Sequence, residues 1–139
     1  MCVDDVEYNL IALEAFLTMM KEKHETYVDP EKALLAFEKS LNKKCCNKGY
    51  TFIITDIFMP VLNGFDLSKK MLELHQKKRM EDRTFKNAEL TIVAVTASED
   101  DEVEKKALKA GITKVIMKPL IHSKCVKIVD KYFKKNVVR

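Results

Sequence analysis

Apolar residues recur along the chain in two spacings, one typical of helices and one typical of buried strands. Helical spacing runs from Asn9 to His24 and begins again after Asp29, where Asp followed by Pro favours a helix start. Nearly continuous apolar runs occur at 50–57, 90–96 and 112–117, and the first two are rich in β-branched residues. Such runs are typical of strands covered on both faces, as in a parallel sheet.

Three further helices are predicted between and after these strands. Their apolar stripes consist, in chain order, of Leu67, Met71 and Leu74; of Val103, Ala107 and Ala110; and of Ile121, Cys125, Ile128 and Tyr132. Ser98 followed three residues later by Asp101 predicts the start of the second of these helices, and Gly111 predicts its end. The charged stretch 77–86 is interpreted as a helix end followed by a loop.

Strands that alternate with helices predict an α/β fold with a doubly wound parallel sheet. The length of 139 residues fits one domain. A first strand would have only Met1, Cys2 and Val3 ahead of the acids Asp4 and Asp5, so we expect the natural chain to extend upstream of Met1.

Polar side chains stand where the predicted strands end: Asp4 and Asp5, Asp56, Thr96 and Lys118. In a doubly wound sheet, ligands bind beyond the carboxyl ends of the strands, so these side chains are expected to meet. Taken singly, each has an ordinary explanation, because Asp caps helices and forms turns, Thr favours strands and most lysines are solvated. Together they predict a functional site.

The chemistry of this set points to phosphoryl transfer. Three carboxylates in one pocket repel each other and require a cation, and oxygen ligands with room for water suit Mg²⁺. The metal would neutralise phosphate oxygens and allow a carboxylate such as Asp56 to attack a phosphoryl donor. Lys118 would add a second positive charge, and Thr96 would donate a hydrogen bond.

The spacing of these residues resembles the receiver domain of two-component response regulators. The matching segments are Asp4-Asp5-x-x-x-Asn9, Asp56-x-x-Met59-Pro60-x-x-x-Gly64, Ala94-Val95-Thr96-Ala97 and Lys118-Pro119, and the resemblance covers residues 1–139. It implies a flavodoxin-like sheet of five parallel strands in the order 2-1-3-4-5, with the short first strand inside the sheet. It also implies a cis peptide bond before Pro119.

By this resemblance, Asp56 is the phosphoacceptor, and Asp5 and Asp56 bind Mg²⁺ directly. Asp4 would act largely through water, and the backbone carbonyl of Phe58 would complete the protein's share of the metal ligands.

Thr96 and Lys118 would hold the phosphoryl group by the same resemblance. The donor would be a sensor histidine kinase or a histidine phosphotransfer protein, and phosphorylation would switch partner binding in a phosphorelay. The chain would be a stand-alone shuttle or, as we expect from its start, a piece of a longer protein such as a hybrid histidine kinase.

Two features depart from the family pattern. Val115 stands three residues before Lys118, where the family usually carries Tyr or Phe as a rotating switch. The first strand is so short that we expect its neighbours to be left unpaired and Asp4 and Asp5 to be displaced.

Two other functions stay open. A degenerate receiver would serve as a protein-interaction scaffold that never takes phosphate. A haloacid-dehalogenase-like phosphatase also uses Asp, Thr, Lys and Mg²⁺, but its DxDx[TV] pattern does not occur in this sequence.

Composition indicates no further function. The net charge of +4 arises largely from lysines near the end, and no nucleic-acid motif accompanies it, so binding of nucleic acid is not expected. Membrane contact is not expected either, because no apolar run approaches the roughly 18 residues of a membrane span. The four cysteines lack C-x-x-C spacing and are expected to be reduced thiols of a cytoplasmic protein. The sequence leaves open whether the chain forms a homodimer.

Overall fold

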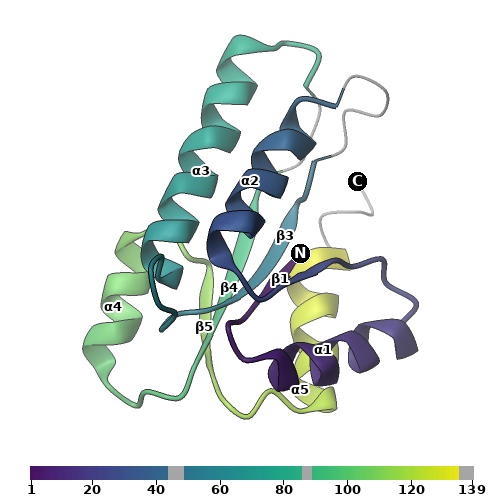
Figure 1. Ribbon diagram of the computed structural model, residues 1–139, viewed down its shortest axis with the longest axis vertical. Coiled ribbons are helices and arrows are strands. Elements are labelled where there is room, and N and C mark those ends of the chain that lie inside the picture. Colours follow the sequence, from purple (N-terminus) through teal and green to yellow (C-terminus); the bar gives the residue numbers. More distant parts are fainter. Residues whose placement is uncertain (44–48, 86–88, 135–139) are drawn as a thin grey trace.

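Five parallel strands form one sheet in the order β2-β1-β3-β4-β5, which confirms the predicted doubly wound α/β fold (Figure 1). The computed structural model describes residues 1–43, 49–85 and 89–134. The strands are β1 (Cys2–Val3), β2 (Thr26–Tyr27), β3 (Phe52–Asp56), β4 (Thr91–Thr96) and β5 (Lys114–Met117). The helices are α1 (Glu7–Met19), α2 (Pro30–Leu41), α3 (Gly64–Glu81), α4 (Asp101–Lys109) and α5 (His122–Ile128), and α5 continues as a π-helix over Val129–Lys134.

The short first strand pairs with both of its neighbours. Cys2 lies beside Thr26 of β2 and beside Ile54 of β3, and Val3 is paired in the same way. The expectation that so short a strand would leave its neighbours unpaired and displace Asp4 and Asp5 is therefore wrong. Two residues are enough to continue the hydrogen bonding between β2 and β3.

The sheet separates two apolar layers, as expected for helices on both faces (Figure 1). Residues of β3 alternate between them: Ile53 packs in the layer of α2, α3 and α4, and Ile54 packs in the layer of α1 and α5. The first layer contains Phe37, Leu67, Met71 and Ala107, and the second contains Leu10, Leu13, Cys125 and Val129. This double coverage explains why the strand sequences read as continuous apolar runs.

Several predicted boundaries move by a few residues. The first helix ends at Met19 rather than His24, because Lys21 adopts a left-handed backbone conformation with φ of 58°. The residue that caps α4 is Asp100, whose side chain accepts a hydrogen bond from the Glu102 amide, and not Ser98. Ile121 precedes α5 and is 48% exposed, so it does not contribute to the buried stripe.

Other local predictions are confirmed. Asp29 caps α2 through the amides of Glu31 and Lys32, Gly111 follows α4 with φ of +91°, and the bond between Lys118 and Pro119 is cis. The buried Cys2 and Cys125 are free thiols, while Cys45 and Cys46 lie outside the described residues. In the described part of the chain, every helix is too short or too polar to cross a membrane.

Candidate functional site

The parallel register of β1 and β3 brings two acids together at the end of the sheet. Val3 is paired with Thr55, so the chain leaves both strands at neighbouring positions, with Asp4 next to Asp56. Asp4 is buried, and its side chain is held on both oxygens: Oδ1 accepts from the Val6 amide at 2.9 Å, and Oδ2 accepts from Asn9 Nδ2 at 3.1 Å. These bonds tie the carboxylate to the start of α1.

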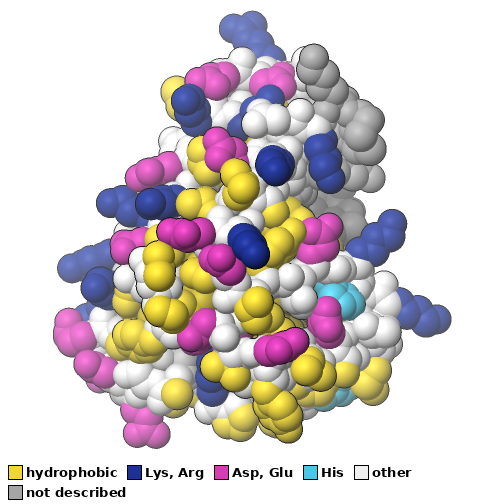
Figure 2. All heavy atoms as spheres, in the orientation of Figure 1, with side chains coloured by type: hydrophobic (Ala, Val, Ile, Leu, Met, Phe, Trp, Pro, Cys, Tyr) yellow, Lys and Arg dark blue, Asp and Glu magenta, His cyan; other side chains and the backbone are white. Residues whose placement is uncertain are grey.

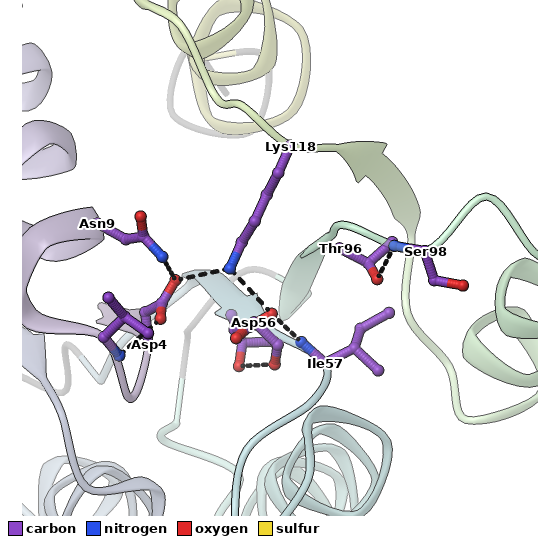
Figure 3. A network of polar contacts seen from close by, with 9 residues as sticks. Asp4, Asn9, Asp56, Ile57, Thr96, Ser98 and Lys118 are labelled. Atoms are coloured by element: carbon purple, nitrogen blue, oxygen red, sulfur yellow. Dashed lines mark hydrogen bonds and ion pairs between the residues drawn. The ribbon is translucent and has the colours of Figure 1, made fainter.

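Lys118 joins the two carboxylates (Figure 3). Its ammonium lies 3.2 Å from Asp4 Oδ2 and 3.3 Å from Asp56 Oδ1. The lysine is positioned by the sheet, because its backbone amide donates to the Thr96 carbonyl at 2.8 Å, directly after β5. The side chain is partly buried, so the ion pairs are less screened by solvent than pairs on an open surface.

One oxygen of Asp56 stays open. Oδ1 accepts from the Ile57 amide at 2.9 Å and contacts Lys118, whereas Oδ2 has no hydrogen-bond partner among the described residues. Burial, and then the neighbouring charge of Asp4, raise the pKa of Asp56 above its ordinary value of 3.8, while Lys118 acts in the opposite direction. The carboxylate is therefore held in a place where its negative charge is only partly compensated.

Three carboxylates converge on a space that suits a cation. One oxygen from each of Asp4, Asp5 and Asp56 lies within 4.8 Å of the others. Asp5 is exposed, whereas Asp4 and Asp56 are buried. The structure thus brings together the acids that the sequence predicted as a set.

Thr96 lies at the end of β4 on the opposite side of Asp56 from Asp4 (Figure 3). It is almost fully buried, and its hydroxyl oxygen accepts from the Ser98 amide at 3.1 Å. Within the described part of the chain, this hydroxyl makes no hydrogen bond to Asp56 or Lys118. Since the oxygen acts as an acceptor here, its own proton is available for a donor role.

The loop after β3 approaches the site closely because of Gly64. The Gly64 amide donates to the Ile57 carbonyl at 2.7 Å, and a Cβ at this position would lie 2.3 Å from the Asp56 carbonyl oxygen. Only glycine therefore fits. On the same loop, the ring of Phe58 is 56% exposed and meets Phe65 edge-on at 6.4 Å.

Val115 borders a cavity next to the site. Val115 is half-buried, and a cavity of about 260 Å³ lies between it and Thr96, with Val103 and Met117 also in its wall. A ring at this position would occupy part of that space. With valine at position 115, the space next to Thr96 stays open.

Two residues of the site had no predicted role. The sequence identifies Asn9 only as part of the motif, and the structure shows that its side-chain amide donates to Asp4 Oδ2. The sequence predicts Ser98 as a helix start, and the structure shows that its backbone amide donates to the Thr96 hydroxyl oxygen. The sequence signal that could have revealed the first is an asparagine in the first turn of a helix, five residues after a carboxylate that precedes the helix. The second contact is made by the backbone, so the identity of residue 98 carries no signal for it.

A comparison with protein families decides the classification. The family model of the response regulator receiver domain matches residues 1–130. The chain belongs to the response regulator receiver family. Its role is accordingly that of a receiver domain in two-component signalling.

Known relatives agree with this membership. The receiver is 28% identical over 132 residues to hybrid signal transduction histidine kinase L of Dictyostelium discoideum. The aligned region covers 95% of this chain but only 7% of that kinase.

Two of the similar solved structures bear on the site. One is the receiver domain of Ssk1 in complex with the histidine phosphotransfer protein Ypd1 from Saccharomyces cerevisiae, with a TM-score of 0.77, 25% identity and coverage of 97% of this chain and 88% of that one. The other is the receiver domain of the sensor histidine kinase PA1611 from Pseudomonas aeruginosa, solved with a magnesium ion in its active-site cleft. It has a TM-score of 0.70, 21% identity and coverage of 94% and 93%.

Proposed function

We propose that this receiver takes a phosphoryl group onto Asp56 from a phosphohistidine, with Mg²⁺ as cofactor, and switches partner binding in response. The proposal rests on the two oxygens of Asp56. Oδ2 has no hydrogen-bond partner among the described residues, and Lys118 contacts Oδ1 of the same carboxylate. An attacking oxygen and a positive charge for the incoming phosphoryl group are thereby present side by side.

The acidic cluster fits magnesium. Its three carboxylates offer only oxygen ligands, and Asp5 is open to solvent, which suits an ion that keeps several waters. The raised pKa of Asp56 is a second argument, because it arises from burial and then from the charge of Asp4, and a cation at the carboxylate would offset both. The related PA1611 receiver carries Mg²⁺ in its cleft. Asp5, Asp56 and the Phe58 carbonyl would hold the ion here, and Asp4 would act through water.

Bound magnesium would neutralise phosphoryl oxygens and so lower the repulsion between donor and carboxylate. The remaining steps belong to side chains of this chain. Asp56 Oδ2 forms a bond to phosphorus while the bond between phosphorus and the donor's imidazole nitrogen breaks. The electron pair of the broken bond stays on that nitrogen, and the products are the aspartyl-phosphate and the free histidine of the donor. Lys118 leaves its pairing with Asp56 Oδ1 to contact a phosphoryl oxygen, and Thr96 donates its proton to another.

Exposed apolar side chains flank the site and support a protein donor. Tyr8 and Ile11 lie one turn apart on α1 and are 79% and 57% exposed, and Val61 on the loop after β3 is 88% exposed. Figure 2 shows hydrophobic side chains along the lower edge of the molecule, where α1 lies. Exposed apolar groups around a reactive centre are typical of a protein contact surface. The Ssk1 receiver binds a histidine phosphotransfer protein, and we infer a partner of this kind.

A phosphoramidate experiment tests the proposal, since this small donor carries the same phosphorus–nitrogen bond as phosphohistidine. With phosphoramidate and Mg²⁺, we expect the wild-type chain to gain one phosphoryl group and the Asp56→Asn variant to gain none. Lys118→Met should slow labelling by about 10²-fold, as loss of one preorganised donor typically does. Lys114→Met removes an exposed lysine of β5 and should leave the rate unchanged.

The degenerate-receiver alternative predicts different results. An intact site should raise the thermal midpoint of unfolding in millimolar Mg²⁺, because an ion that binds only the folded state stabilises it. No change in that midpoint, together with no labelling of a folded sample, would favour the scaffold. Turnover of a small phosphate ester that depends on Asp56 would favour the phosphatase.

A further inference from the structure

A cavity of about 450 Å³ lies between α1, the sheet and the segment after β5. Most of its wall is apolar and includes Leu10, Leu13, Ile54, Val95 and Leu120. The charged residues of the wall are Asp4, Asp56 and Lys118, and their ion pairs hold them together (Figure 3). One cavity thus offers a charged cluster and an apolar surface to the same ligand.

Two uncharged polar side chains of the wall already have partners. Asn9 Nδ2 donates to Asp4 Oδ2 at 3.1 Å, and the Thr55 hydroxyl donates to the backbone carbonyl of Asp56 at 2.9 Å. Asp56 is only 7% exposed, yet its Oδ2 has no hydrogen-bond partner among the described residues. A buried carboxylate oxygen without a partner is unfavourable, so a ligand that donates a hydrogen bond to it is stabilised.

The charge of the wall favours a cation. Asp4 and Asp56 carry two negative charges and Lys118 carries one positive charge, so one negative charge is uncompensated. A metal ion would compensate it but would leave the apolar wall without contacts. Small-molecule sites typically enclose roughly 300–1,000 Å³ and combine a mostly apolar wall with a few polar groups that orient the ligand. The ligand that fits both parts of this wall has one positive charge and an apolar body.

We propose that this cavity binds small primary amines with an apolar chain, in their ammonium form, and that a bound amine prevents phosphorylation of Asp56. The binding of the amine stands apart from the proposed function, whereas its effect on phosphorylation rests on that function. The ammonium group donates to Asp56 Oδ2, and the apolar wall, which includes Leu13 and Leu120, covers the chain.

The amine and the phosphoryl group exclude each other because both need the same oxygen. In the proposed function, Asp56 Oδ2 forms the bond to phosphorus. An ammonium group that donates to this oxygen blocks the approach of phosphorus. No covalent bond forms or breaks when the amine binds, so removal of the amine restores the acceptor.

Ala12 offers a way to fill the cavity without changing its charge. It is half-buried and has the smallest side chain that α1 contributes to the wall. Ala12→Phe would place a ring in the cavity. Ala15 lies on the same helix but is exposed and outside the wall, so Ala15→Phe is a matched control with the same change in size and helix propensity.

The binding test is a titration at pH 7 without Mg²⁺, followed in ¹H–¹⁵N NMR spectra, with hexylammonium, ethylammonium and hexanoate as probes. Hexylammonium should shift the amide signals of Leu13 and Leu120, and hexanoate should not. We expect hexylammonium to bind at least about tenfold more tightly than ethylammonium, because each buried methylene adds roughly threefold in affinity. Ala12→Phe and Asp56→Asn should each weaken hexylammonium binding by about tenfold or more, and Ala15→Phe should preserve it.

Two results on the wild-type chain alone would overturn the inference, so the test does not depend on a variant that folds. One is equal affinity for hexylammonium and ethylammonium, which would mean that the apolar wall takes no part. The other is a hexanoate shift as large as that of hexylammonium, which would mean that the cavity does not select a positive charge.

The effect on phosphorylation is measured separately, with phosphoramidate at one Mg²⁺ concentration and the adduct followed by intact mass. Hexylammonium at about ten times its dissociation constant under these conditions should slow labelling about tenfold, because about nine-tenths of the sites are occupied. Ethylammonium at the same concentration should have little effect. Unchanged labelling with hexylammonium bound would overturn the exclusion and leave the role of Asp56 intact. No labelling without any amine would overturn the proposed function, while the NMR titration still decides whether the cavity binds the amine.

Discussion

Gly64 offers the sharpest test of how the fold positions the acceptor. In Gly64→Ala, the new Cβ would lie 2.3 Å from the Asp56 carbonyl oxygen and 2.8 Å from Ile57 Cα, both of them backbone atoms. Ordinary contact begins at 3.4 Å, so the backbone of Asp56 must shift by roughly 1 Å, the difference between 3.4 and 2.3 Å. Forcing extra volume into a packed site costs about 1–3 kcal/mol of stability. A misplacement of about 1 Å at a reacting group costs roughly 10²-fold in rate.

Gly111→Ala provides the matched control. Gly111 has φ of +91°, where alanine is strained by about 1–2 kcal/mol, and its new Cβ would meet only the flexible end of Leu72. We therefore expect both variants to show a similar loss in the free energy of unfolding in urea. Only Gly64→Ala should accept the phosphoryl group more slowly than the wild type. The reasoning fails if Gly64→Ala accepts phosphate at the wild-type rate, or if Gly111→Ala slows to the same extent.

Three further predictions follow from single residues. Val61 is a β-branched residue with φ of 70° on an exposed loop, a backbone conformation that favours glycine. Val61→Gly should therefore raise the free energy of unfolding by about 1 kcal/mol, and a loss of stability in urea titration would contradict this. The raised folded-state pKa of Asp56 means that its ionisation destabilises the native state, so stability falls as pH rises from 3.8 through the folded pKa. Asp56→Asn should therefore raise the thermal midpoint at pH 7 without Mg²⁺ and have little effect below pH 3.8, whereas an equal effect at both pH values would refute the assignment. The exposed ring of Phe58 stands beside the site and is expected to restrict water, so Phe58→Asn should shorten the lifetime of the aspartyl-phosphate, and an unchanged rate of dephosphorylation would exclude that role.

The sheet and the convergence of the acids could be predicted because they follow from local signals. Buried strands such as 52–56 read as continuous apolar runs, and the carboxyl ends of parallel strands necessarily meet at one edge. The stability of the two-residue β1 could not be predicted, because it depends on backbone pairing with Thr26 and Ile54 from distant segments. A short strand carries no periodicity of its own.

The finer geometry of the site also depends on tertiary contacts. Nothing in the local sequence indicates that Lys118 bridges Asp4 and Asp56, since these residues come from three different strand ends. A cavity of about 450 Å³ between α1, the sheet and the segment after β5 is likewise invisible in the sequence, because Leu13 in its wall looks like any other core residue of an amphipathic helix. Motif spacing predicts which residues meet, whereas the free oxygen of Asp56 and the space beside it require the structure.

Intact mass after incubation with Mg²⁺ and acetyl phosphate tests the central claim most directly. The account predicts one added phosphoryl group on the wild-type chain, and none on Asp56→Asn or when Mg²⁺ is withheld. A folded wild-type sample that gains no mass, or an Asp56→Asn sample that gains as much as the wild type, would contradict the assignment of Asp56 as the phosphoacceptor.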